Sequence, residues 1–106
     1  RMIALVQQAL ASRRNLHVPA GVVGQVWRDG RRQATLARLL RAREVSTVPL
    51  DAELAGACGE LCGAVGTSDV IDASVVLCAR EHGDVIVTGD AGDLRRLDPT
   101  AVIVEV

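Results

Sequence analysis

The sequence predicts an α/β fold in which a parallel sheet is covered by helices on both faces. Helical stretches alternate with short hydrophobic strands, as in proteins whose parallel strands are joined by helical crossovers. Val85-Ile86-Val87 is apolar at every position, which is typical of a strand buried on both faces. Because the chain has 106 residues, we expect one domain over residues 1–106.

The first half of the chain predicts three helices and two strands. Apolar residues at three- and four-residue spacing indicate the helices; Pro19 suits the first turn of the second one, and Gly30 ends it. The predicted helices cover residues 1–13, 19–28 and 31–43, and the predicted strands cover 16–18 and 45–48. The first helix has no visible cap, so the chain opens in mid-element.

The second half carries clear helix boundaries. Asp51 caps a helix whose apolar stripe ends at Gly66. The next helix, which Thr67 and Ser68 can cap, stops at Gly83. The remaining predicted elements are a strand over 85–87, a turn or short helix over 90–97 and a strand over 102–104.

The composition is that of a soluble globular protein. Hydrophobic residues make up 49% of the chain, and no apolar run approaches the roughly eighteen residues needed to cross a bilayer. No stretch resembles an export signal, and three scattered cysteines do not make a disulfide framework. We therefore expect a cytoplasmic protein that does not enter a membrane.

Charge is segregated along the chain. Residues 1–43 hold nine arginines and one acid, whereas residues 44–106 hold three arginines and twelve acids. This division favours either a phosphate-binding surface beside a metal site or the two halves of a homotypic interface. The arginines that could steer RNA phosphates, or instead form a solvated helix face, are Arg13, Arg14, Arg28, Arg31, Arg32, Arg38, Arg41 and Arg43.

Aromatic residues are almost absent. With one Trp and no Phe or Tyr, the chain offers hardly any base-stacking platform, so we expect RNA to be recognised by shape and backbone. Trp27 lies on an apolar helix face and is assigned to the core or to a dimer interface.

Acidic residues gather at two places where parallel sheets form sites. Thr88, Asp90 and Asp93 directly follow an apolar strand, with two glycines that leave room for close approach. Asp69 and Asp72 lie one turn apart at a helix start, where the helix dipole favours carboxylates. Asp69 is at least as well explained as a capping residue, whereas Asp72, among apolar neighbours, needs a partner or a cation.

Carboxylates gathered at the mouth of a sheet repel one another unless a divalent cation neutralises them. Oxygen ligands suit Mg²⁺ or Mn²⁺ rather than zinc. Phosphodiester hydrolysis uses such sites, because the metal ions generate hydroxide and stabilise the leaving oxygen. The acids therefore favour a metal-dependent phosphodiesterase.

Three stretches carry a resemblance to a known family. They are Val18-Pro19-Ala20 leading to Val26-Trp27-Arg28, Asp72-Ala73-Ser74-Val75-Val76-Leu77-Cys78-Ala79, and Thr88-Gly89-Asp90-Ala91-Gly92-Asp93-Leu94. Together they resemble the PIN domain, and particularly the VapC-type toxins of bacterial toxin–antitoxin pairs. The resemblance extends from about residue 15 to the end of the chain, and the spacing between its second and third stretches is its most specific part.

The resemblance implies a PIN-like three-layer fold with a central parallel sheet, and an endoribonuclease that depends on Mg²⁺ or Mn²⁺. Asp72 and Asp90 match the family's third and fourth acids, and Asp93 matches its accessory acid, so these three would bind the metal. Thr88 matches the family's hydroxyl residue and, with Gln25, would hold water or ligand positions. The implied partners are an RNA substrate, a small VapB-type antitoxin that inserts into the site, and a second copy of the chain in a homodimer.

Two departures from the family pattern bear on activity. The family's second acid falls on Gln25, which neither lowers a metal's charge nor acts as a base, so cleavage could be slower, use one ion or be absent. The first acid and the central strand that carries it have no counterpart in these residues. We expect about thirty further residues before Arg1 in the natural protein. We also expect little nuclease activity from the 106 residues alone.

Other interpretations stay open. A catalytically inactive PIN-like module that binds a protein partner or RNA fits Gln25 and the missing first acid. A phosphoacceptor receiver domain shares an acidic pocket but needs a downstream lysine, and the chain has none. A Cys₃His zinc site is conceivable, although buried thiols explain the same residues, which are Cys58, Cys62, Cys78 and His82.

Overall fold

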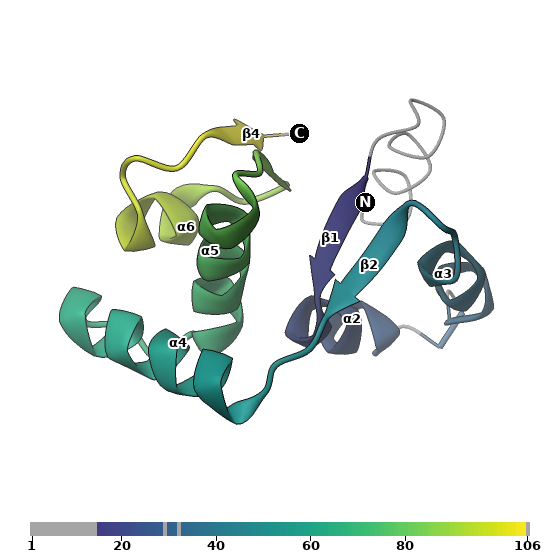
Figure 1. The fold of residues 1–106 in the computed structure, drawn as a ribbon, viewed down its shortest axis with the longest axis horizontal. Coiled ribbons are helices and arrows are strands. Elements are labelled where there is room, and N and C mark those ends of the chain that lie inside the picture. The colour runs from purple at the N-terminus through teal and green to yellow at the C-terminus, as the bar shows by residue number, and fades with distance from the viewer. Residues whose placement is uncertain (1–14, 29, 32, 106) are drawn as a thin grey trace. The chain divides into compact units, whose positions relative to one another are not determined.

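A computed structural model describes residues 15–28, 30, 31 and 33–105. The helix predicted over 1–13 lies outside these residues, as do Arg13, Arg14 and Arg32. Contacts divide the chain into two compact units, Arg1–Pro49 and Leu50–Val106, which are described separately below. Figure 1 colours the described elements in chain order, from β1 in purple to β4 in yellow.

The N-terminal unit contains a parallel strand pair joined by two helices. Its elements are β1 (Leu16–Pro19), α2 (Ala20–Trp27), α3 (Gln33–Leu40) and β2 (Val45–Val48). Leu16 pairs with Val45 in parallel register, and Val18 and Val45 are buried beneath apolar residues of both helices. The predicted strands and the helices predicted over 19–28 and 31–43 are confirmed, although α3 is shorter than the predicted helix at both ends.

Trp27 does not belong to the core of this unit. The residue is 38% exposed, and α2 has no fully buried residue. The helix contacts the strand pair through Val22 and Val23, one turn earlier. The assignment of Trp27 to the core is therefore wrong, and a dimer interface stays a prediction.

The C-terminal unit packs three helices with a second parallel strand pair (Figure 1). Its elements are α4 (Ala52–Val65), α5 (Val70–His82), β3 (Ile86–Thr88), α6 (Gly92–Leu97) and β4 (Ile103–Glu105). All three helices and β3 contribute buried residues to one core, which contains Cys58, Cys62, Ala73, Val76, Ile86, Leu94 and Leu97.

The ends of α4 follow from local sequence signals. The Asp51 carboxylate accepts a hydrogen bond of 2.8 Å from the Leu54 amide, as an N-cap does. Gly66 ends the helix in the left-handed region, with φ at +86°. Gly83 ends α5 in the same way, with φ at +66°. Both predicted stops are confirmed.

Gly66→Ala is expected to lower the free energy of unfolding by about 1 kcal/mol, because a Cβ is strained at that backbone conformation. Gly63 provides a matched control, since it lies inside α4 with open space where a Cβ would be. Gly63→Ala is expected to raise the free energy of unfolding by about 0.5–1 kcal/mol. Urea denaturation measures both, and equal losses at the two positions would contradict the assignment of Gly66 as the helix stop.

Of the cap candidates that the sequence offers for α5, the structure uses Asp69. Thr67 and Ser68 do not cap the helix; Asp69 does, and the Thr67 hydroxyl instead accepts a hydrogen bond of 3.4 Å from the Asp69 amide. Three consecutive residues here can all act as caps, and the chain uses the last one.

The strands confirm the α/β class but correct one detail of the sheet. The described strands form two parallel pairs, β1–β2 in the N-terminal unit and β3–β4 in the C-terminal unit. Ile86 is buried, whereas Val85 and Val87 are 51% and 43% exposed, so burial of this strand on both faces is wrong. The reason is that the core packs only on the face that carries Ile86 and Ile103.

Within the described parts of the chain, no single helix has the length and apolar character to cross a membrane. The consecutive helices α4 and α5 reach that length and composition only as a pair, and they meet at an angle of 108°.

Candidate metal centre

The surroundings of Asp72 bring the predicted acids together. Asp72 lies in the first turn of α5, and burial is the main cause that raises the pKa of its carboxyl to about 6. Asp69 adds to this pKa through its charge and a side-chain hydrogen bond, and the charges of Asp93 and Asp90 add further. Asp69, Asp90 and Asp93 are therefore the acidic neighbours that act on Asp72 within the C-terminal unit. We call Asp69, Asp72, Asp90 and Asp93 the acid cluster.

Asp69 has two roles in this arrangement. Its Oδ1 atom accepts hydrogen bonds from the amides of Ile71 and Asp72, at 3.1 and 3.0 Å. The same carboxyl is hydrogen-bonded to the side chain of Asp72. The capping interpretation is therefore confirmed, and the residue also lies beside the proposed ligands. Its spacing of three residues from Asp72 is the sequence signal for that second role.

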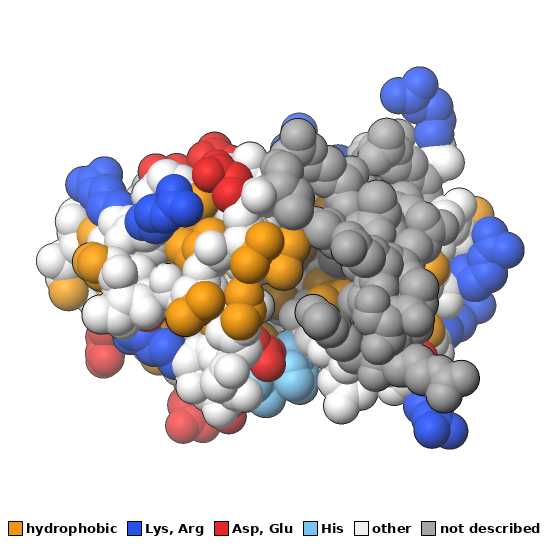
Figure 2. Space-filling view, turned by 90° about the horizontal axis from the view of Figure 1, so that it is seen from above, with side chains coloured by type: hydrophobic (Ala, Val, Ile, Leu, Met, Phe, Trp, Pro, Cys, Tyr) orange, Lys and Arg blue, Asp and Glu red, His pale blue; other side chains and the backbone are white. Residues whose placement is uncertain are grey.

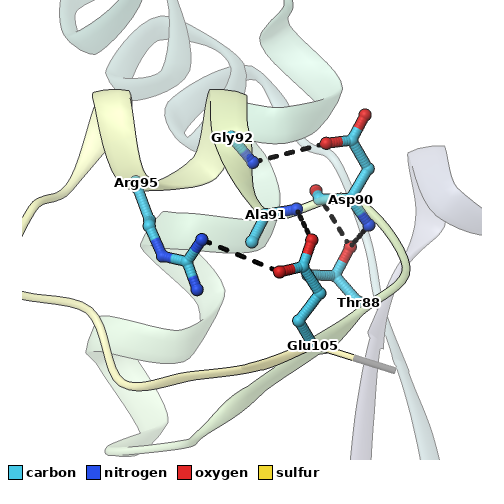
Figure 3. Close-up of polar contacts among 6 residues, drawn as sticks. All are labelled: Thr88, Asp90, Ala91, Gly92, Arg95 and Glu105. Carbon is cyan, nitrogen blue, oxygen red and sulfur yellow. Dashed lines mark hydrogen bonds and ion pairs between the residues drawn. The ribbon is translucent and has the colours of Figure 1, made fainter.

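The loop between β3 and α6 is held by its own side chains (Figure 3). The Asp90 amide donates to the Thr88 hydroxyl oxygen at 3.2 Å, and that hydroxyl donates to the Asp90 carbonyl at 3.2 Å. The Gly92 amide donates to Asp90 Oδ1 at 3.3 Å. In Figure 3 the second carboxylate oxygen of Asp90 points away from these loop contacts. Thr88 thus shapes the turn, while one oxygen of Asp90 lies outside the loop's hydrogen bonds.

Glu105, at the end of β4, is a neighbour of this loop that sequence reasoning missed. It pairs with Thr88 in the parallel register of β3 and β4. Its Oε1 atom accepts a hydrogen bond from the Ala91 amide at 3.3 Å, and its Oε2 atom lies 3.8 Å from Arg95 Nη1. The rule that sites form where parallel strands end, applied to β4 as well as to β3, would have selected it.

A comparison with protein families identifies the fold. Residues 5–98 match the family model for the PIN domain. The chain belongs to the PIN domain family. No curated protein and no solved structure was found that matches the chain. The PIN domain is a nuclease-like fold whose members generally depend on a divalent metal and act on RNA, so the resemblance read from the sequence is confirmed at that level.

The acid cluster of this PIN domain offers only oxygen donors. The acid cluster offers carboxylate oxygens, and Asp90 and Asp93 are exposed while Asp72 is half-buried. Burial and, after it, neighbouring negative charges raise the pKa of Asp72, and a cation placed among these charges would be stabilised by them. Such oxygen ligands suit Mg²⁺ and Mn²⁺.

The remaining predicted site residue of the PIN domain lies in the other unit. Gln25 is an exposed residue of α2 in the N-terminal unit, whereas the acid cluster belongs to the C-terminal unit. Its role in the site stays a prediction.

The cysteines of the PIN domain have the character of core residues. Cys58, Cys62 and Cys78 are free and buried. Burial raises the pKa of the Cys58 and Cys78 thiols, which disfavours the thiolate form that binds zinc. The Cys78 thiol lies 3.7 Å from Nδ1 of His82, one turn along α5. These observations favour buried thiols over a Cys₃His zinc site.

Proposed function

We propose that this PIN domain is a metal-dependent endoribonuclease of the VapC-type toxin class, which hydrolyses phosphodiester bonds in RNA. The observation that supports the proposal most is that the charges of Asp69, Asp93 and Asp90 all act on the half-buried Asp72 carboxyl, whose pKa burial and these charges together raise to about 6. Carboxylates on a protein surface are usually separated from one another, because like charges repel. A cluster of this kind is what a divalent cation and a phosphodiester require.

The residues of the chain take distinct roles in this proposal. Asp72, Asp90 and Asp93 hold Mg²⁺ or Mn²⁺, which when bound supplies an acidified water and stabilises the leaving oxygen. Thr88 keeps the Asp90 loop in shape through its hydroxyl. Thr88 and Gln25 hold water or ligand positions. Asp69 orients the start of α5 as its cap.

Binding of RNA would depend on its phosphates. The described arginines of the N-terminal unit are exposed, namely Arg28, Arg31, Arg38, Arg41 and Arg43. Guanidinium groups on a surface attract the RNA backbone without reading its sequence. A homodimer and a VapB-type antitoxin that blocks the site belong to the same proposal.

An RNA cleavage assay with the gene-encoded protein tests the proposal. Asp90→Asn is expected to abolish both Mn²⁺ binding and cleavage of single-stranded RNA, because the amide neither neutralises the cation nor replaces a charged ligand. Glu60→Gln is the matched control, since it removes the same charge from an exposed position on α4. Unchanged cleavage by Asp90→Asn, or metal-independent cleavage by the parent, would contradict the proposal.

A second candidate function is a PIN-like module that binds RNA or a protein without cutting it, and the neutral Gln25 favours it. The variant Gln25→Glu distinguishes the nuclease from a module that binds without cutting. If Gln25 faces the metal, the added carboxylate is expected to tighten Mn²⁺ binding by roughly tenfold and to raise the cleavage rate. Calorimetry and a cleavage assay measure these effects. A variant with unchanged metal affinity and rate would show that position 25 does not face the site.

A further inference from the structure

Glu105 approaches the Asp90 loop from the neighbouring strand β4. It ends β4 and is 49% exposed at its side chain. It is not among the charges that raise the pKa of Asp72. The carboxylate is instead directed at the backbone of the loop and at Arg95, as Figure 3 shows.

The contact with Ala91 acts on a particular peptide group. The Asp90 carbonyl and the Ala91 amide belong to the same planar peptide unit. The Thr88 hydroxyl donates to that carbonyl at 3.2 Å, and Glu105 Oε1 accepts from that amide at 3.3 Å. Both ends of the peptide plane are thus held, one from β3 and the other from β4.

Holding this plane fixes the backbone of the loop that carries Asp90. The plane begins at the Asp90 Cα atom, so a displacement of the plane also moves the Cα atom from which the carboxylate extends. Ala91 is fully buried, which leaves the plane little room to turn on its other side. The ion pair with Arg95 contributes less, because its two side chains are 49% and 56% exposed and 3.8 Å apart.

We propose that Glu105 is a positioning residue for Asp90, which aims the carboxylate at the cation by fixing the Asp90–Ala91 peptide plane. The inference rests on the proposed function, in which Asp90 binds the metal. It extends the site to the end of β4, seven residues beyond the stretch 5–98 that the family model matches. Loss of a group that orients a metal ligand without binding the metal typically lowers metal affinity by about 10- to 100-fold.

Three variants of the gene-encoded protein separate the contribution of the hydrogen bond to Ala91 from that of the ion pair with Arg95. Glu105→Ala removes both contacts, Glu105→Gln keeps an oxygen for the Ala91 amide, and Arg95→Met removes only the ion pair. Glu105→Ala is expected to weaken Mn²⁺ binding by about tenfold or more, measured by calorimetry at a temperature where every variant is folded. Glu105→Gln restores most of the lost affinity, and Arg95→Met changes it by less than about twofold.

A second measurement needs no metal. In the metal-free protein, hydrogen exchange at the Ala91 amide is expected to be faster in Glu105→Ala than in Glu105→Gln or the parent, because only the alanine variant lacks the acceptor. Unchanged exchange in Glu105→Ala would show that the bond does not hold the plane and would overturn the inference.

The outcomes distinguish this inference from the proposed function. If the parent protein binds no Mn²⁺, the proposed function fails while the exchange experiment still tests the bond. If the parent binds Mn²⁺ and Glu105→Ala binds it equally well, with only its thermal stability lowered, Glu105 is structural and the inference is overturned. Equal losses of Mn²⁺ affinity in Glu105→Ala and Glu105→Gln would indicate that Glu105 binds the metal directly, which also overturns the positioning role.

Discussion

Asp72→Asn is expected to stabilise the metal-free protein at neutral pH while it removes Mn²⁺ binding. At pH 7.5 the parent holds an ionised carboxylate at position 72, which is half-buried and lies beside three other acids. Its pKa is raised to about 6 because burial and these neighbouring charges disfavour the ionised form. An asparagine side chain carries no charge and can still donate a hydrogen bond to Asp69, as a protonated Asp72 does. The rise of the Asp72 pKa from 3.8 to about 6 corresponds to roughly 3 kcal/mol. Partial exposure of the side chain reduces the expected gain in the free energy of unfolding to about 1–2 kcal/mol.

The pH dependence of this gain has a definite sign. Because the pKa is raised in the folded state, the folded protein holds the Asp72 proton more tightly than the unfolded chain does. The stabilisation from that proton is complete below about pH 4, the usual pKa of an aspartate, and is lost as the pH rises through about 6. The advantage of Asp72→Asn over the parent is therefore expected at pH 7.5 and should vanish below about pH 4.

Urea denaturation in EDTA at several pH values measures the stability, and calorimetry measures Mn²⁺ affinity. The affinity is expected to fall by about a hundredfold or more, since a direct ligand is lost rather than an outer partner. Glu60→Gln again serves as the control for loss of one exposed charge. A variant that is less stable than the parent at pH 7.5 and still binds Mn²⁺ would refute the placement of Asp72 in the acid cluster.

Asp98→Ala is expected to cause the largest loss of stability, about 3 kcal/mol. The Asp98 side chain is only 6% exposed and accepts a hydrogen bond of 2.9 Å from Arg80 Nε. It also accepts bonds from the Thr100 hydroxyl and amide, at 2.6 and 2.9 Å. These contacts join α5 to the turn before β4, and the alanine variant leaves the Arg80 and Thr100 donors without their acceptor.

The same contacts predict an acid-dependent stability. Hydrogen bonds from Thr100 and Arg80 hold the pKa of Asp98 down at about 2. A lowered pKa means that the stabilisation is complete above about pH 4 and is lost as the pH falls through about 2. Urea denaturation at pH 7 and pH 2 measures this, with Glu81→Ala as a control that removes an exposed acid from α5. A loss in Asp98→Ala no larger than that of Glu81→Ala would contradict the role of the buried carboxylate.

Several features of this protein could be predicted because their causes are local. Asp51, Gly66 and Gly83 bound helices through bonds and backbone angles that involve only neighbouring residues. The positions of Thr88, Asp90 and Asp93 after an apolar strand indicated a site for the same reason. Among three adjacent cap candidates, however, local chemistry did not select Asp69 over Thr67 and Ser68.

The amino-acid sequence by itself determined the alternation of helices and strands, the helix stops and the acids that follow β3, because these depend on propensity, period and spacing along the chain. Tertiary structure alone decided which faces of β3 are buried, that Asp90 and Asp93 act on Asp72, and that Glu105 reaches the Ala91 amide. The reason is physical: burial and strand register bring together groups that lie far apart in the sequence, and no local pattern records those distances.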